Sequence, residues 1–174
     1  MSRLGPFEFS MRARQPAAHN VLVTRVSMVD IGRPIEGKLF IGTVPSNRDD
    51  LCHDITLAIA VGPACLPDLP DLFEDIMCVP IPDSPLAGLQ LLEALPEVQN
   101  RISKTLQAGQ NVLVCSPSGR SRCAAVVIAY LINRRNMTYM DAYAAVRTAR
   151  PSIQPNFGFD TMLVNLGIGH RGQV

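Results

Sequence analysis

The residues best suited to chemistry form one short segment, SPSGRSR at positions 116–122. An apolar run, NVLVC (111–115), precedes it and another, CAAVVIAYL (123–131), follows it, so a buried strand leads through a tight turn into a helix. Backbone N–H groups in such a turn, and those at the start of the helix, can converge on one phosphate. The sequence therefore predicts a phosphate-binding loop made of Ser116, Pro117, Ser118, Gly119, Arg120, Ser121 and Arg122.

Three residues of this loop have individual roles. Gly119 provides the backbone freedom that a tight turn needs. Arg122 lies in the first turn of the predicted helix, where its planar guanidinium can hold two phosphate oxygens. Arg120 is expected to project from the mouth of the loop towards a second phosphate or an acidic segment of a partner. The Walker pattern GxxxxGK[ST] is absent, which excludes a nucleotide P-loop of that type.

The flanking sequence predicts the elements that position the loop. Short apolar runs alternate with amphipathic ones, which indicates an α/β fold with three layers and a central, mostly parallel sheet flanked by helices. The expected domain spans residues 21–168, between a flexible N-terminal tail (1–20) and a C-terminal tail (169–174). Strands are expected at 39–42, 55–61, 76–81 and 111–115, and helices at 86–109, 123–136, 139–150 and 156–166.

Composition limits the classes of function. The 174 residues are 47% hydrophobic and 18% charged, enough for one core, and the net charge of +1 gives no general attraction to nucleic acid or membrane. The five cysteines follow no CxxC spacing, so neither a disulfide framework nor a metal site is expected, and no cofactor is indicated. No signal peptide or membrane-spanning run is recognised, and the expected location is the cytoplasm or nucleus.

The segment VCSPSGRSRC resembles the signature of the cysteine-dependent protein phosphatases, HCxxGxxR followed by Ser or Thr, and its surroundings resemble the dual-specificity branch. Matched without a gap, Gly119 and Arg122 fall on the signature Gly and Arg. IEGKLFIGT, IPDSP and RPSIQPNFGF resemble other segments of that family in the same order. The resemblance implies the dual-specificity phosphatase fold over roughly residues 25–166, Asp83 at the general-acid position and Asn156 as a support behind the loop.

Three catalytic positions depart from the signature. Cys115 stands at the His position, Ser116 at the nucleophilic Cys position and Cys123 at the hydroxyl position after the Arg. A cysteine in such a loop is a thiolate at neutral pH, whereas a serine hydroxyl stays protonated. The sequence therefore predicts a pseudophosphatase similar to the serine/threonine/tyrosine-interacting members, which binds phosphorylated Ser, Thr or Tyr in a partner protein, or a signalling kinase, and regulates phosphorylation signalling without efficient hydrolysis.

Other interpretations stay open at this stage. Cys115 could be the nucleophile of an active phosphatase, with Asp83 as general acid, if the loop were one residue longer, although adjacent strand residues face opposite ways. Cys115 could equally be a core residue, or form a redox disulfide with Cys123 if their Cα atoms lie within about 7 Å. Asp83 could be only a turn residue. An engineered serine at position 116 is disfavoured, because a single engineered change does not explain all three departures from the signature. Oligomeric state and pocket depth are not fixed by the sequence.

Overall fold

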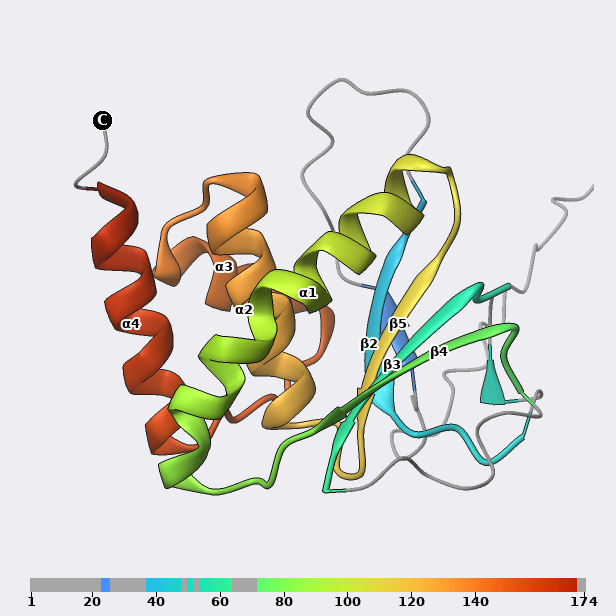
Figure 1. Ribbon diagram of the computed structural model, residues 1–174, viewed down its shortest axis with the longest axis horizontal. Coiled ribbons are helices and arrows are strands. Elements are labelled where there is room, and N and C mark those ends of the chain that lie inside the picture. The colour runs from blue at the N-terminus through green and yellow to red at the C-terminus, as the bar shows by residue number, and fades with distance from the viewer. Residues whose placement is uncertain (1–22, 26–36, 48–49, 52–53, 64–71, 172–174) are drawn as a thin grey trace, which may run out of the picture.

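A computed structural model describes residues 23–25, 37–47, 50–51, 54–63 and 72–171. It shows a mostly parallel sheet with helices packed beside it (Figure 1). The strands are β1 (Val23–Arg25), β2 (Leu39–Thr43), β3 (Leu57–Gly62), β4 (Asp75–Pro80) and β5 (Val112–Ser116). The helices are the 3-10 helix η2 (Pro85–Ala87) and the α-helices α1 (Gly88–Gln107), α2 (Arg122–Arg135), α3 (Tyr139–Ala149) and α4 (Phe157–Arg171).

The strand order places the predicted phosphate-binding loop at the carboxyl end of the central strand of the sheet. The order is β1-β2-β5-β3-β4, and all neighbours are parallel except β1, which pairs antiparallel with β2. β5 is therefore the central strand, and Thr43 at the end of β2 pairs with Ser116 at the end of β5. In open α/β sheets, ligands bind beyond the carboxyl ends of the strands. The segment after Ser116 occupies that place.

The four described α-helices pack on one face of the sheet, where α2 is buried along most of its length. Alternate residues of the strands, such as Val112 and Val114 of β5, point to this face. Leu113 and Cys115 point to the other face, into a second apolar cluster that includes Phe40 and Phe73. The central, mostly parallel sheet and the helices packed against it confirm the predicted α/β fold.

The predicted elements correspond to observed ones with small shifts at their ends. The predicted helix at 86–109 is divided into η2 and α1, with Pro96 inside α1. Thr138 caps α3 by accepting a 3.1 Å hydrogen bond from the backbone N–H of Asp141. β1 was not predicted. α4 continues to Arg171, so the first residues of the predicted C-terminal tail are helical, while residues 1–20 and 172–174 lie outside the described residues.

The cysteines differ in part from expectation. Cys115 and Cys123 are buried free thiols, whereas Cys78 on β4 is disulfide-bonded. The cysteine spacing indicated no disulfide framework, so the disulfide at Cys78 was not predicted. Within the described ranges, no helix is long and apolar enough to cross a membrane. The same part of the chain contains no cluster of three or more His, Cys, Asp or Glu side chains arranged as a metal site.

Candidate phosphate-binding site

The loop begins where β5 ends, and its turn depends on Gly119. The Gly119 N–H donates a 3.0 Å hydrogen bond to the carbonyl oxygen of Ser116, which closes the turn. Gly119 has a φ of 62°, in the left-handed region that residues with a Cβ rarely adopt. A Cβ there would lie 2.7 Å from the Thr43 nitrogen and 2.7 Å from Arg150 Nη2. Both the dihedral angle and the space at the end of β2 therefore require glycine.

Arg122 supplies a buried cationic group that lacks a full complement of partners. It begins α2 and is 7% exposed. Its Nε makes no hydrogen bond to any described residue, and its closest acidic neighbour by ion-pair geometry is Asp83, with 3.8 Å between Nε and Oδ2. A buried donor left without an acceptor is destabilising by about 1–3 kcal/mol. Arg122 is thus held ready for an acceptor that the protein does not provide.

Asp83 is tied to both the loop and the start of α4. Its Oδ1 accepts a 2.6 Å hydrogen bond from Ser121 Oγ and a 2.8 Å bond from Asn156 Nδ2. The backbone N–H of Asn156 donates to Ser121 Oγ at 3.1 Å, and Asn156 Oδ1 accepts from the N–H of Phe159, which caps α4. The sequence placed Asp83 and Asn156 near the loop only through the family resemblance. Here they form one network with Ser121.

The segment 150–154 braces the loop from outside. Arg150 is buried, and its Nε donates a 2.6 Å hydrogen bond to the Gly119 carbonyl. The Gln154 N–H donates to the Arg120 carbonyl at 2.8 Å. The Arg120 guanidinium donates in turn to the Ser152 carbonyl at 3.2 Å and to Gln154 Oε1 at 2.6 Å.

These contacts change the roles that the sequence indicates. Arg120 is expected from the sequence to reach from the mouth of the loop towards a partner, but its side chain is engaged by the segment 150–154. Arg150, to which the sequence assigns no role at the loop, supports it through the Gly119 carbonyl. Its position immediately before Pro151, inside RPSIQPNFGF, is the available signal, because that whole segment resembles the family.

The family signature has a cysteine at position 116 and a hydroxyl residue at position 123. This chain has the reverse, with Ser116 and Cys123. Ser116 is 1% exposed, and its Oγ has no hydrogen-bond partner of ordinary geometry in the described residues. Burial raises the pKa of Cys123 to about 11, although the nearby Ser116 hydroxyl and the charge of Arg150 act in the opposite direction. The Cys123 thiol is therefore neutral at physiological pH. The neighbouring side chain at position 116 is an alcohol.

Cys115 does not lie on the face of β5 that carries Ser116. Its side chain is fully buried in the second apolar cluster. Burial, and to a smaller extent the charge of Cys123, raise the pKa of Cys115 to about 12. A thiol with this pKa is protonated at neutral pH and is a poor nucleophile. The geometry argues against Cys115 as the attacking group, and both thiols are free rather than joined in a disulfide.

The loop, the buried arginine and the Asp83 network match a known domain. Residues 43–167 match the family described as dual specificity phosphatase, catalytic domain. The chain belongs to the dual-specificity phosphatase family. The match covers most of the chain and includes every residue of the loop.

Several individual members of the dual-specificity phosphatase family are similar. Human dual specificity protein phosphatase 18 is 29% identical over 161 residues, which cover 90% of this chain and 78% of that protein. A crystal structure of human DUSP28 superposes with a TM-score of 0.71 at 28% identity, covering 86% of this chain and 95% of the other. The structure of human tyrosine phosphatase-like serine/threonine/tyrosine-interacting protein gives a TM-score of 0.67 at 31% identity, with 76% and 93% covered. The chain spans 40% of the full-length human serine/threonine/tyrosine-interacting protein.

Proposed function

We propose that this dual-specificity phosphatase domain is a pseudophosphatase that binds phosphorylated Ser, Thr or Tyr in partner proteins and does not hydrolyse the ester efficiently. The observation that carries the proposal is the buried Arg122 guanidinium, whose Nε lacks an acceptor among the described residues, in a loop that begins with an alcohol, Ser116. The guanidinium provides binding, and the alcohol cannot replace a thiolate.

Phosphate binding is supported by the donors around the loop. Among the described turn and loop residues, the backbone N–H groups of Ser118, Arg120 and Ser121 donate to no backbone carbonyl. The start of α2 adds N–H groups and the positive end of its dipole. Ser116 is neutral, so it does not repel a phosphate dianion as a thiolate would. These groups are donors to an anion whether or not a nucleophile is present.

The absence of efficient hydrolysis is supported by the surroundings of Ser116. A serine nucleophile needs a base within about 2.6–3.2 Å to take its proton. Ser116 Oγ has no hydrogen-bond partner of ordinary geometry among the described residues, so no carboxylate or imidazole of that part of the chain is in reach. Asp83, at the general-acid position, is hydrogen-bonded to Ser121 and Asn156.

Binding and hydrolysis are separated by one set of measurements. Isothermal titration with inorganic phosphate, tungstate and O-phosphotyrosine tests binding, and turnover of para-nitrophenyl phosphate tests hydrolysis. We expect binding by the wild type, loss of binding in Arg122→Ala and no turnover in either. Arg134→Ala is the matched control, because Arg134 is an exposed arginine at the other end of α2, where it donates to Asn100 Oδ1. Turnover by the wild type that Arg122→Ala removes would overturn the proposal.

We infer the partner class from the site and from the relatives together. A loop that fits phosphate suits a phosphorylated signalling protein or kinase, which the domain would shield from active phosphatases or hold in a complex. One relative is named for interaction with serine, threonine and tyrosine, and this agrees with such a role. We propose the cytoplasm or nucleus as the place of action, which imaging of the fluorescently tagged chain tests.

A further inference from the structure

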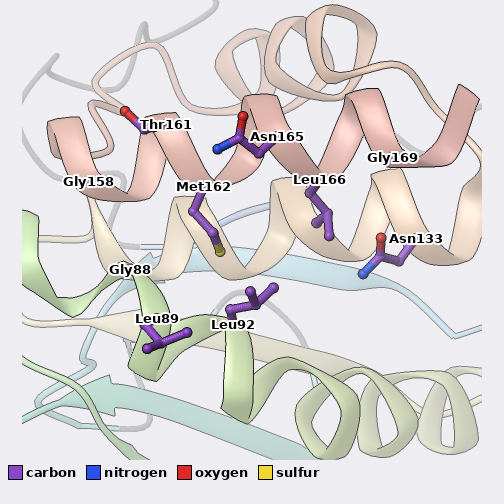
Figure 2. A pocket seen from close by; sticks show the side chains of 10 residues that line it. All are labelled: Gly88, Leu89, Leu92, Asn133, Gly158, Thr161, Met162, Asn165, Leu166 and Gly169. Atoms are coloured by element: carbon purple, nitrogen blue, oxygen red, sulfur yellow. The ribbon is translucent and has the colours of Figure 1, made fainter.

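A groove of about 630 Å³ lies between α1 and α4 with α2 at its side (Figure 2). Figure 2 shows Met162 and Leu166 pointing from α4 towards α1, and Leu89 and Leu92 on the α1 side. None of the residues that line it carries a charge. These residues are Gly88, Leu89, Leu92, Asn133, Gly158, Thr161, Met162, Asn165, Leu166 and Gly169.

The apolar surface of the groove is exposed. Leu89 is 66% and Leu92 is 40% exposed. Leu86 and Phe157, which stand close in the chain to the groove residues Gly88 and Gly158, are 91% and 80% exposed. Single exposed leucines are ordinary, but a contiguous apolar surface around a cavity marks an interaction site. The groove and these flanking side chains therefore require a ligand with apolar groups.

One end of the groove lies next in the chain to the residues that hold the phosphate loop. Gly158 packs so closely on η2 that a Cβ there would lie 1.8 Å from the Pro85 carbonyl oxygen, which holds the start of α4 against η2. Immediately before these two elements stand Asp83 and Asn156, joined by the 2.8 Å hydrogen bond that closes the loop network. The two elements that open the groove, η2 with the start of α1 and the start of α4, therefore directly follow the two residues that connect them to the loop network. A peptide bound at the loop has the open end of the groove within a few residues of Asp83 and Asn156.

We propose that the groove binds an apolar segment of the same phosphoprotein whose phosphate occupies the loop, an inference that rests on the proposed function. The groove follows α4 from Gly158 to Gly169. At about 1.5 Å of rise per residue, this stretch is roughly 16 Å long, which an extended peptide covers in about five residues. The expected ligand has Leu, Ile, Met or Phe side chains within about six residues of the phosphorylated one.

The edges of the groove suit a peptide more than a purely hydrocarbon ligand. Asn133 lies at one end, with its Nδ2 donating to Gln99 Oε1 at 3.3 Å, and Thr161 and Asn165 lie along the α4 rim. Such side-chain amides and hydroxyls can pair with the N–H and C=O groups of a bound backbone. A charged side chain would find no counter-ion among the lining residues. The groove therefore selects against charged residues near the phosphate.

An oriented peptide library tests this specificity with probes that span many possible partner sequences at once. Phosphotyrosine and phosphothreonine libraries are fixed at the central residue and randomised over six positions on each side, and peptides retained by the full chain are sequenced. We expect Leu, Ile, Met and Phe to be enriched on one side of the phosphorylated residue, with Asp, Glu, Lys and Arg depleted there. A retained pool without apolar enrichment would overturn the inference.

Two matched variants locate the effect. Leu89→Asp places a charge at the groove, and Met140→Asp places one on a 70% exposed methionine of α3, outside it. Each residue is the second of its helix, where an aspartate favours the helix dipole, so neither variant is expected to unfold the domain. For a peptide from the enriched pool, Leu89→Asp should weaken binding about fivefold or more, and Met140→Asp should not.

Failure of the groove and failure of the loop give different results. If Leu89→Asp and wild type bind the selected peptide equally, the groove is not its site, even if Arg122→Ala still abolishes binding. If Arg122→Ala has no effect while Leu89→Asp weakens binding of the same peptide, the phosphate proposal fails and the groove binds an apolar peptide alone. Sedimentation of the wild type completes the set: a dimer that Leu89→Asp dissociates would assign the groove to a second copy and overturn the inference.

Discussion

Asp83 and Arg122 face one another at the mouth of the loop with 3.8 Å between Oδ2 and Nε, too long for a hydrogen bond and short enough for an ion pair. Asp83 is fixed there by its hydrogen bonds from Ser121 and Asn156. An incoming phosphate therefore meets a guanidinium whose charge is partly compensated by a carboxylate. The Asp83 carboxylate therefore lowers the affinity of the site for phosphate.

Neutralising Asp83 should strengthen phosphate binding. Asp83→Asn keeps an oxygen that can accept from Ser121 and Asn156 while removing the charge beside Arg122. Because the carboxylate is partly exposed, with 32% of its side-chain area accessible, screening limits the gain to roughly three- to tenfold. Titration calorimetry with inorganic phosphate measures it. Asp75→Asn is the control, since Asp75 pairs with Arg101 at the opposite end of the strands, and an equal gain there would reject this explanation.

Gly119 and Gly169 form a natural pair for a test of the loop geometry. Gly119→Ala forces a Cβ into the left-handed region and against the Thr43 nitrogen, so we expect destabilisation of about 1–3 kcal/mol and loss of phosphate binding. Gly169→Ala meets no atom within 4 Å and lies in α4, so it should be neutral or slightly stabilising. Urea unfolding and phosphate titration of both variants check this. Retained phosphate affinity in Gly119→Ala would show that the loop does not need its observed turn.

Stability should fall at alkaline pH because of two buried thiols. The pKa of Cys115 is raised to about 12 and that of Cys123 to about 11, mainly by burial, whereas an unfolded cysteine titrates near pH 8.5. Between these values the unfolded chain binds fewer protons than the folded one, so the free energy of unfolding decreases as pH rises. Their contribution is complete below about pH 8.5 and is lost towards pH 11–12.

Urea midpoints at pH 7.5, 9 and 10 measure this decrease. Cys115→Ala should flatten the dependence, even though the substitution itself lowers stability at pH 7.5 through lost packing in the second cluster. Labelling with iodoacetamide at pH 8, resolved by site with mass spectrometry, should leave both thiols unmodified until the protein unfolds. Fast labelling of Cys115 in the folded protein would contradict its burial and revive its role as nucleophile.

The sequence was sufficient for the fold because local patterns and tertiary structure agree. The apolar run ending at Cys115 is the central strand, and the helix predicted at 139–150 is observed as α3 (Tyr139–Ala149). β1 was missed because a three-residue strand leaves almost no periodic signal. The position of the phosphate loop followed from its residue types, since Gly and Arg are required there for reasons of geometry.

Side-chain pairing in the site was not predictable in the same way. Arg120 lies in the loop and Arg150 packs against it, and nothing in the local sequence indicates which arginine donates to the Gly119 carbonyl and which to Gln154. The groove beside the loop was invisible, because its walls come from α1 and α4, which are separated by two other helices in the chain. Leu89 falls at a helical spacing that predicts an apolar, core-facing position, but it is mostly exposed.

Restoring a thiol at position 116 should restore chemistry. In Ser116→Cys the sulfur lies where the loop N–H groups and the start of α2 stabilise an anion, which lowers its pKa relative to a buried thiol elsewhere. The thiolate would attack phosphorus, the ester oxygen would leave with a proton from Asp83, and water would release phosphate from the sulfur. We expect turnover of para-nitrophenyl phosphate, with a rate that rises with pH as the thiol ionises.

Because the hydroxyl and the thiol are exchanged between positions 116 and 123, we expect that adding Cys123→Ser to Ser116→Cys increases the phosphatase activity. Cys123 lies beside position 116 and stays protonated, but a thiol is a weak hydrogen-bond donor. Ser116→Cys combined with Cys123→Ser gives the thiolate a hydroxyl donor, so the double variant should have the lower thiol pKa and the higher rate near pH 6. Cys123→Ser alone should remain inactive. Intact mass spectrometry after rapid quenching would detect the phosphocysteine. If the double variant binds phosphate but forms no such adduct, Asp83, which is held by Ser121 and Asn156, cannot act as the acid.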